Sequence, residues 1–481
     1  MKANNCPLLA SSQNPLARLM RRTKIIATVG PSTDKPGMLE KMIAAGVDLF
    51  RINYSHQSHA DHERRVAEIR KVAASLKVEV GIICDLQGPK IRIEKFSAGK
   101  VTLKKGDDFT FNTKMKTDAG DQQQVGVTYK NLVEDVELGK RLLLDDGKLA
   151  LEVKEVDDEQ IKCEVLIGGV LSDNKGINLQ GGGLSAAALT AKGKKDLKHG
   201  VKIGVDYFTV SFVLMTDDVL EARKLLDAQG CNASIIAKFE RAEALENAES
   251  IIAVSDAIMI ARGDLGVEIG DAALPPVQKR LIKQARVMDR AVITATQMME
   301  SMIEQQTPLR AEVFDVANAV LDGTDAVMLS GETSIGKFAD KVVEAMSRIC
   351  TETKKQRTTK VSGHRLNLRF ERVDEAIAMS SMYAANHIGA KAIAALTETG
   401  STCLWMSCIN SGIPIFAFTR HTSTVRKVKL FRGVYPVRFD ITHTDPLEGN
   451  NRLPLSVENS GERRLRNHYQ RRFTRSPRWH Q

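Results

Sequence analysis

Two stretches near the middle of the chain decide its fold: Ser234–Glu240, with the sequence SIIAKFE, and Ala257–Asp264, with the sequence AIMIARGD. Each is a short and almost continuous apolar run, which is typical of a strand buried on both faces in a parallel sheet. Each also ends in charged residues. The pattern therefore predicts buried parallel strands whose carboxyl ends carry polar side chains.

Six further runs of this kind lie on either side, at Thr23–Gly30, Val47–Asn53, Val80–Leu86, Asp206–Phe212, Ala291–Gln297 and Asp325–Gly331. Between them apolar residues recur every three or four positions, as in Met38–Ala45, Glu63–Val72 and Val277–Met288, which predicts amphipathic helices. Eight alternating strand and helix units predict an α/β fold, a (β/α)8 barrel over residues 21–87 and 188–358.

The alternation is interrupted once, between the third and fourth strands. Residues 88–187 contain the short runs Val101–Leu103, Phe109–Phe111, Arg141–Asp145 and Ile161–Val165, with Asp146-Gly147 as a hairpin signal. We expect a small all-β domain, of the β-barrel type, inserted over residues 88–187. A second α/β domain is expected over residues 359–440, with a helix at Val373–His387 and strands at Ala392–Thr397 and Ile413–Phe418.

Composition excludes several protein classes. The 481 residues are 43% apolar and 27% charged, which excludes a wholly disordered or collagen-like chain. No window approaches 18 consecutive apolar residues, so no membrane-spanning helix is expected. The seven cysteines are dispersed without a C-x-x-C pair, which favours a reducing cytoplasmic location over a disulfide scaffold or structural zinc site.

The two ends of the chain differ from the rest. Residues 1–20 are polar and lack the apolar core of a secretory signal, so we expect a loose N-terminal extension. The net charge is +10, and residues 441–481 hold eight Arg and no Lys against four acidic residues. This segment is predicted to be a basic, disordered tail.

The carboxyl ends of the predicted strands carry polar residues: Arg51, Asn53, Asp85, Ser211, Lys238, Glu240, Asp264, Thr296 and Ser330. A barrel forms its active site at this face. Glu240 and Asp264 would end neighbouring strands, and two hard oxygen ligands suit Mg²⁺, although ion pairs with Lys238 or Arg262 are the alternative. Lys238 lies two residues before Glu240, so both would face the barrel mouth, where an ammonium can stabilise an oxyanion. Arginines 51 and 92 are candidates for phosphate recognition.

Some motifs favour a structural interpretation. Gly331–Lys337, GETSIGK, matches the first seven positions of a phosphate-binding loop, but Phe338 follows where Ser or Thr is required. The spacing of His56, His59 and His62 allows metal binding, yet a solvated loop and helix start is favoured. The run Gly181-Gly182-Gly183 is interpreted as a hinge, and the methionines of residues 298–302 as helix packing.

The chain resembles the pyruvate kinase family, of the bacterial type, over about residues 21–440. The resemblance rests on these ordered segments: Thr23–Pro31, Arg51–His56, Asp85–Arg92, Leu143–Gly147, Asn174–Asn178, Ala237–Ala244, Ala261–Gly270, Ala295–Met302 and Val316–Thr333. It implies a barrel, an inserted lid and a C-terminal effector domain. It also implies transfer of a phosphoryl group from phosphoenolpyruvate to ADP, giving pyruvate and ATP in the last step of glycolysis.

The resemblance implies roles for individual residues. Lys238 would stabilise the enolate, Arg51 would hold the phosphate, and Gly263 and Thr296 would contact the substrate, with Thr296 near the proton delivered to the enolate. The other implied roles are Mg²⁺ binding by Glu240 and Asp264, monovalent-cation binding by Asn53, Ser55 and Asp85, and nucleotide contacts by Asn53, His56, Arg92 and Lys175.

The chain departs from the family pattern at several positions. Lys90 stands where potassium-dependent members carry Glu, so a weak K⁺ requirement is expected. Residues Gln57, Gly193, Leu214, Leu309 and Ala339 also differ, and Ser401 stands in the Thr397–Thr402 effector-loop segment where Arg is common. The resemblance ends at Asp440. The family homotetramer and its sugar-phosphate or AMP regulation are therefore expected only if the altered C-terminus permits them.

Two alternatives to an active kinase stay open. One is a catalytically impaired chain whose Arg-rich tail binds nucleic acid or an acidic partner, although an unselected disordered end is favoured for that tail. The other is a different barrel enzyme acting on an enolate or phosphoenolpyruvate; the inserted lid and Lys175 argue against it.

Overall fold

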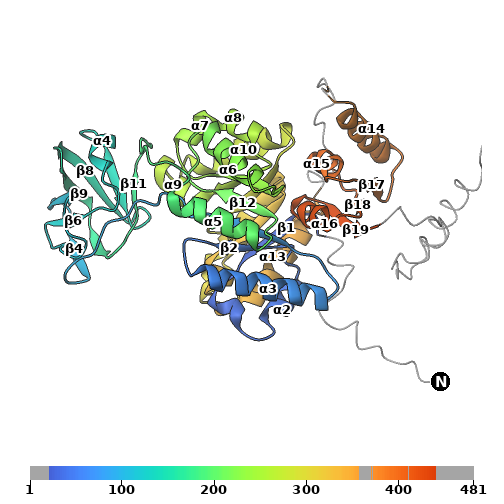
Figure 1. The fold of residues 1–481 in the computed structure, drawn as a ribbon, viewed down its shortest axis with the longest axis horizontal. Helices are drawn as coiled ribbons and strands as arrows, with labels where there is room; N and C mark the ends of the chain where they lie inside the picture. The colour runs from blue at the N-terminus through green and yellow to red at the C-terminus, as the bar shows by residue number, and fades with distance from the viewer. Residues whose placement is uncertain (1–20, 357–369, 371, 410, 440–481) are drawn as a thin grey trace, which may run out of the picture. The chain divides into compact units, whose positions relative to one another are not determined.

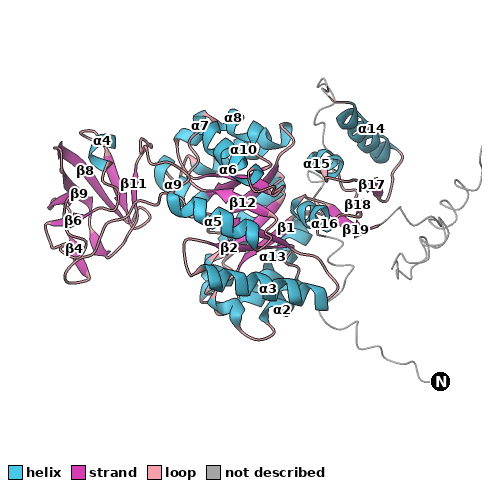
Figure 2. Cartoon of the chain, in the orientation of Figure 1, coloured by secondary structure: helices cyan, strands magenta, loops and turns pink. Residues whose placement is uncertain are grey.

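The computed structural model describes residues 21–356, 370, 372–409 and 411–439. The expected N-terminal extension at residues 1–20 and the expected tail at 441–481 lie outside these residues. The described chain contains a barrel, an inserted all-β domain and a C-terminal α/β domain (Figures 1 and 2).

Eight parallel strands close into a barrel in the order β1-β16-β15-β14-β13-β12-β3-β2. Their bounds are β1 Lys24–Thr28, β2 Leu49–Asn53, β3 Gly81–Asp85, β12 Tyr207–Val210, β13 Ser234–Phe239, β14 Ala257–Ala261, β15 Ala291–Ala295 and β16 Ala326–Leu329. Each strand lies inside one of the eight runs identified in the sequence. The predicted barrel class is confirmed.

The barrel strands are joined by helices and short turns: η2 Pro31–Asp34, α2 Met38–Ala45, α3 His59–Ser75, α5 Ala191–Lys202, α6 Thr216–Asp227, α7 Glu243–Glu246, α8 Ala248–Val254, α9 Arg262–Ile269, α10 Leu274–Val287, η3 Glu300–Ile303, α11 Arg310–Asp322, α12 Gly331–Ser334 and α13 Ala339–Thr353. The longer helices bury one apolar stripe, as Leu281, Ile282 and Ala285 do on α10. The predicted helix Met38–Ala45 matches α2 in both bounds.

One strand end differs from the prediction. The sixth strand was expected to run to Asp264, but β14 ends at Ala261 and α9 begins at Arg262. Asp264 therefore lies in the first turn of a helix. The run of apolar residues stops at Ala261, and a carboxylate in the first turn also suits the positive end of the helix dipole.

The inserted domain contains eight strands and one short helix: β4 Lys100–Leu103, β5 Asp108–Asn112, β6 Gln124–Gly126, α4 Leu132–Asp135, β7 Arg141–Leu144, β8 Leu149–Val156, β9 Gln160–Ile167, β10 Gly169–Ser172 and β11 Ile177–Leu179. They pair into a two-stranded sheet, β10-β4, and a six-stranded sheet, β11-β7-β8-β9-β5-β6. The predicted hairpin at Asp146-Gly147 joins β7 to β8, with both residues at positive φ. A separate apolar core fills this domain.

The C-terminal domain contains α14 Val373–His387, β17 Ile393–Leu396, α15 Ser401–Cys408, β18 Ile415–Thr419, α16 Thr422–Lys427, η5 Val428–Leu430 and β19 Val434–Arg438. Its three strands form a parallel sheet in the order β17-β18-β19. The predicted helix at Val373–His387 and the two predicted strands are confirmed, and β19 is an addition. Among the described residues, no helix has the length and apolar character needed to cross a membrane.

Candidate active site

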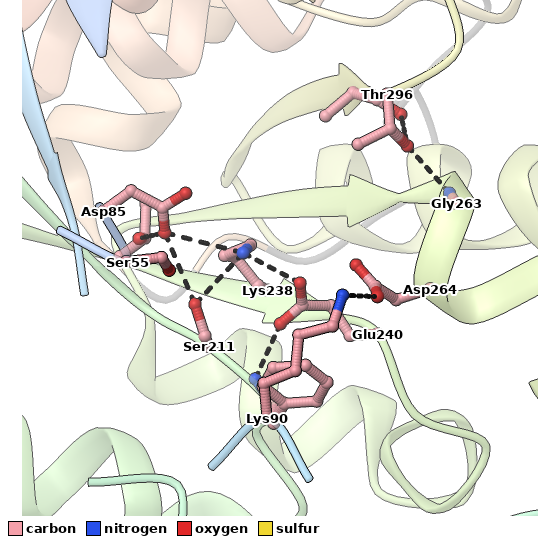
Figure 3. A network of polar contacts seen from close by, with 12 residues as sticks. Ser55, Asp85, Lys90, Ser211, Lys238, Glu240, Gly263, Asp264 and Thr296 are labelled. Atoms are coloured by element: carbon pink, nitrogen blue, oxygen red, sulfur yellow. Dashed lines mark hydrogen bonds and ion pairs between the residues drawn. The ribbon is translucent and has the colours of Figure 1, made fainter. Parts of the chain in front are cut away.

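The candidate site is built around a buried lysine at the end of β13. Lys238 lies in the strand and Glu240 follows it by two residues, so their side chains share one side. Lys238 Nζ lies 2.8 Å from Glu240 Oε1 and 3.5 Å from Asp85 Oδ1 (Figure 3). Burial alone would lower the pKa of Lys238, but these two carboxylates raise it. The ammonium is therefore held charged at the barrel mouth.

Asp85, the last residue of β3, contacts two cationic side chains, Arg51 and Lys238. Arg51 Nε on β2 donates to Asp85 Oδ2 at 2.6 Å. Burial acts to raise the pKa of this carboxyl, but Arg51 and Lys238 outweigh it and hold the value at about 2. Asp85 is thus an ionised carboxylate that fixes Arg51 and Lys238 in position.

The pKa of the second carboxylate, Glu240, is shifted in the opposite direction, upward. Glu240 is almost fully buried, and burial raises its pKa to about 7, with the neighbouring Asp264 adding to the rise and Lys238 opposing it. Its Oε2 accepts the backbone N–H of Phe212 at 2.7 Å. Two carboxyl groups this close together disfavour each other's ionisation, and such a pair of oxygen donors fits a divalent cation.

A second lysine contacts Asp264, one carboxylate of this pair. Lys90 Nζ lies 3.5 Å from Asp264 Oδ1 and 3.9 Å from Asp146 Oδ1 of the inserted domain (Figure 3). Within the described ranges, no group of three or more His, Cys, Asp or Glu side chains is arranged to hold a metal ion. Two carboxylates are fewer donors than such a group, and Mg²⁺ normally keeps water and substrate ligands as well.

Thr296 and Gly263 lie together on the other side of the mouth. The Gly263 N–H donates to Thr296 Oγ1 at 2.7 Å, and that hydroxyl donates to the Ala295 carbonyl at 2.6 Å. Thr296 has φ +65°, a left-handed conformation that is uncommon for a residue with a branched side chain. Such backbone strain is often found at functional sites.

The predicted nucleotide residues come from β2 with its following loop and from the inserted domain. Arg92 Nη1 donates to the Asn174 carbonyl at 2.8 Å, and Lys175 Nζ lies 2.7 Å from Asp145 Oδ1. Burial lowers the pKa of His56, and the nearby cations of Arg92, Arg51 and Lys90 lower it further. Arg92 and Arg51 thus lie close enough to His56 to lower its pKa, while Lys175 pairs with Asp145.

The remaining predicted ligands follow β2. Asn53 ends the strand, and its Oδ1 accepts the backbone N–H of Ser55 at 3.1 Å. Asn53 is also the register partner of Asp85 on the neighbouring strand β3. The structure therefore brings together Asn53, Ser55 and Asp85, the three residues assigned to the monovalent cation.

Comparisons with known proteins identify the family of this chain. The family model described as pyruvate kinase, barrel domain, matches residues 20–343, and the model described as pyruvate kinase, alpha/beta domain, matches residues 375–456. The chain belongs to the pyruvate kinase family. The second match extends beyond residue 440, where the resemblance in the sequence ends.

Pyruvate kinases of several organisms are similar to this chain. Pyruvate kinase II of Salmonella typhimurium is 53% identical over 88% of this chain and 89% of its own length. Pyruvate kinase of Staphylococcus aureus is 41% identical over 91% of this chain and 75% of its own length. The crystal structure of a pyruvate kinase from Cryptosporidium parvum superposes with a TM-score of 0.86 at 34% identity, covering 93% of both chains.

The structure adds Thr209 and Ser211 to the site of this pyruvate kinase fold, and the sequence pattern had assigned neither residue a role. Ser211 accepts from Lys238 Nζ at 3.0 Å and donates to the Leu86 carbonyl at 2.9 Å. The Thr209 hydroxyl donates to Asp85 Oδ1. Thr209 and Ser211 alternate with apolar residues at the end of a buried strand, and that alternation is the signal that could have identified them.

The disfavoured motifs are structural. Glu332 of the GETSIGK segment is buried and accepts the backbone N–H groups of Met299 and Ser330, so the segment is a packed helix start. The three methionines of residues 298–302 singled out for packing, Met298, Met299 and Met302, are buried. The expectation of a solvated position is wrong for His62, which is 1% exposed because α3 packs this side against the barrel.

Proposed function

We propose that the chain is an active pyruvate kinase, a phosphotransferase with an alcohol-group acceptor, which transfers the phosphoryl group of phosphoenolpyruvate to ADP. The observation that supports this most is the buried ammonium of Lys238 between Asp85 and Glu240, beside Asp264. Breaking the enol O–P bond leaves negative charge on the enol oxygen. A fixed ammonium lowers the energy of that enolate without reorganisation.

We assign the substrate side of the site to the following groups. The Arg51 guanidinium, already aligned by Asp85, would bind the transferring phosphoryl group through planar hydrogen bonds. The Gly263 N–H and the Thr296 hydroxyl would part from each other to contact the substrate carboxylate. Thr296 would then lie near the carbon that accepts a proton to give pyruvate.

Mg²⁺ fits the two carboxylates Glu240 and Asp264. When bound, it would supply charge neutralisation for the substrate carboxylate and phosphate. We assign the ADP side to Asn53, His56, Arg92 and Lys175, which would hold phosphate oxygens. The inserted domain would act as a lid that excludes water.

We propose that Lys90 makes the chain weakly dependent on K⁺. Its ammonium lies against Asp264, on the side of the mouth where the inserted domain begins. Asn53, Ser55 and Asp85 would still form the monovalent-cation position. The fixed positive charge of Lys90 would neutralise negative charge at the barrel mouth as a bound K⁺ does, and no ion has to be taken up from solution.

We retain the remaining assignments as parts of this proposal: barrel limits of 21–87 and 188–358, a lid at 88–187, an effector-type domain at 359–440, cytoplasmic location, and a homotetramer if the C-terminus permits. The six cysteines among the described residues are free thiols, which supports a reducing compartment.

The proposed effector loop, Thr397–Thr402, leads into α15, and the Gly400 N–H donates to Thr397 Oγ1 at 2.9 Å.

The decisive experiment is a lactate-dehydrogenase-coupled assay with phosphoenolpyruvate, ADP and Mg²⁺. We expect turnover by the full chain, and loss of at least about a thousandfold in kcat for Lys238→Met, because the developing enolate charge would lose its fixed counter-charge. Mg²⁺ binding measured by calorimetry should persist in that variant. Lack of turnover in the unmodified chain would support the catalytically impaired alternative, and retained turnover in Lys238→Met would reject the role of this lysine.

A further inference from the structure

A tyrosine lies directly behind the loop that joins β2 to α3. Tyr54, between Asn53 and Ser55, is 1% exposed, and its side chain packs among three histidines. We call His59, His62 and His199 the histidine cluster. The Tyr54 and His62 ring centroids are 4.2 Å apart, and His59 stacks on His199 at 4.2 Å with an interplanar angle of 7°.

Four polar contacts fix Tyr54, one of them between its hydroxyl and the Cys84 thiol of β3. Its N–H donates to the Asp85 carbonyl of β3 at 3.0 Å. Its carbonyl accepts from Lys192 Nζ at 2.7 Å, and its hydroxyl shares a hydrogen bond of 2.9 Å with His199 Nδ1. The last two partners belong to α5. One helix therefore holds both the main chain and the side chain of a single residue in the loop.

The helix side of this contact is itself fixed. Asp196 of α5 is 1% exposed and binds Lys192 Nζ at 2.6 Å and His59 Nε2 at 2.7 Å. His59 is the first residue of α3, so Asp196 also connects the two helices that flank the loop. The groups that hold Tyr54 are thus connected to each other through Asp196 and His59.

His62 completes the packing without a polar contact. Among the described residues, neither of its ring nitrogens has a hydrogen-bond partner. Burial lowers its pKa to about 4, so the ring is neutral near neutral pH and packs against Tyr54 as an aromatic surface. Of the three histidines, His199 is the one that hydrogen-bonds the tyrosine hydroxyl, and Cys84 is a further partner outside the cluster.

We propose that Tyr54 is a positioning residue for the ADP side of the site, and that its hydrogen bond to His199 sets the conformation of the loop Asn53–His56. This inference rests on the proposed function, which gives that loop the monovalent-cation position and a nucleotide contact. Tyr54 itself touches no reacting group. Fixing its peptide fixes the direction in which the chain presents Ser55 and His56.

The test compares variants of the full chain with Mg²⁺ present. Tyr54→Phe removes only the hydroxyl, and His199→Leu removes its partner. His199→Asn keeps a polar atom near the position of Nδ1 and serves as the conservative rescue. Tyr207→Phe is the matched control, because the Tyr207 hydroxyl is also buried and donates to the Lys427 carbonyl at 2.6 Å, at the amino end of its barrel strand.

We expect Tyr54→Phe and His199→Leu each to raise KM for ADP by about three- to tenfold, the worth of one net hydrogen bond, with KM for phosphoenolpyruvate changing by less than about twofold. The calorimetric Kd for MgADP should change in parallel, which keeps the test independent of turnover. The double variant should be no worse than Tyr54→Phe alone, because that variant already removes the bond to His199. His199→Asn and Tyr207→Phe should leave KM for ADP unchanged.

Several results would overturn the inference: unchanged ADP affinity in Tyr54→Phe, additive losses in the double variant, or equal rises in KM for both substrates. If Tyr54→Phe does not fold, the comparison of His199→Leu with His199→Asn decides. His56→Ala separates this inference from the site assignment. If Tyr54→Phe weakens ADP binding and His56→Ala does not, the positioning role holds and the His56 role is wrong; if neither variant has an effect, both are wrong.

Discussion

Two buried carboxylates contact the same lysine, and yet their pKa values are shifted in opposite directions. Asp85 and Glu240 both lie close to Lys238 Nζ, at 3.5 and 2.8 Å. Asp85 has a second cation, Arg51, and its pKa is held at about 2 against the effect of burial. Burial raises the pKa of Glu240 to about 7, and Asp264 adds to the rise. The contrast separates a carboxylate that is ionised between two fixed cations from one whose ionisation would be favoured by an added cation.

At Lys90 the charge of one residue predicts a cofactor requirement. We expect the rate of the unmodified chain without K⁺ to lie within about twofold of the rate with K⁺, because the ammonium already supplies a fixed positive charge at the mouth. Lys90→Glu should lose at least about tenfold in rate without K⁺ and regain part of it when K⁺ is added. Coupled assays in K⁺ and in tetramethylammonium salts measure this.

The control for Lys90→Glu is Lys95→Glu, which makes the same charge change at an exposed residue of the inserted domain. It should remain as insensitive to K⁺ as the unmodified chain. A large K⁺ requirement in the unmodified chain would show that Lys90 does not replace the cation.

His62 predicts a pH dependence of stability. Burial lowers its pKa from the ordinary 6.5 to about 4 in the folded chain, so the unfolded chain binds the proton first as the pH falls. The folded state should therefore lose stability between about pH 6.5 and pH 4, with no loss from this group above that window. We expect the thermal midpoint to fall from about pH 7 to pH 5, and His62→Phe to reduce that fall. An identical pH dependence in both proteins would reject the assignment.

At the scale of elements, the return linker from the inserted domain is gripped by the turn after β13. Gly181, Gly182 and Gly183 all have positive φ, and the Gly183 N–H donates to Glu243 Oε1. Glu243 also pairs with Arg241 at 3.2 Å. The linker therefore contacts the segment that directly follows Lys238 and Glu240, and the hinge interpretation of the glycine run stays a prediction.

The glycines of this linker differ in what surrounds them. A Cβ at Gly182 would lie 2.5 Å from the Glu243 carboxyl carbon, whereas a Cβ at Gly181 would meet nothing within 4 Å. Both variants to Ala carry a positive-φ strain of about 1 kcal/mol. We expect Gly182→Ala to lower the urea midpoint more than Gly181→Ala, and Glu243→Ala to cancel the difference. Equal midpoints for the two glycine variants would contradict this.

Local pattern predicted the elements well, since each barrel strand lies within a predicted run and the helices α2 and α14 match their predicted bounds. It did not place Asp264, because a polar residue after an apolar run is compatible with both a strand end and the first turn of a helix. It also missed β19, whose Val434–Arg438 segment includes a proline and arginine and is partly exposed at a sheet edge.

At the scale of the whole molecule, the C-terminal sheet is joined to the barrel floor by buried polar contacts. Lys24 Nζ donates to the Val434 carbonyl at 2.6 Å, and the Arg432 N–H donates to Asp325 Oδ1 at 3.0 Å. Asp325 also accepts the Val292 N–H at 2.9 Å. One apolar cluster includes inward-facing barrel residues such as Ile26 and C-terminal residues such as Phe431. The two domains therefore share a continuous core.

This joint predicts a stability effect remote from the active site. Asp325→Ala leaves two buried N–H groups without their acceptor and should lower the free energy of unfolding by about 2–4 kcal/mol. Asp325→Asn keeps one acceptor oxygen and should cost less. Urea unfolding followed by tryptophan fluorescence measures both. A loss below about 0.5 kcal/mol in Asp325→Ala would show that the joint does not depend on this carboxylate.

The sequence by itself determined the barrel class, the inserted domain and the polar carboxyl ends of the strands, because burial and side-chain period are local properties of the chain. Only the tertiary structure decided which polar groups meet. β3 pairs with β12 across the whole inserted domain, and this pairing brings Thr209 and Ser211 to Asp85. The contacts of Lys90 with Asp264 and of Tyr54 with His199 likewise join residues far apart in sequence. Contacts of this kind depend on how the barrel closes, and the local periodicity of the sequence carries no information about that closure.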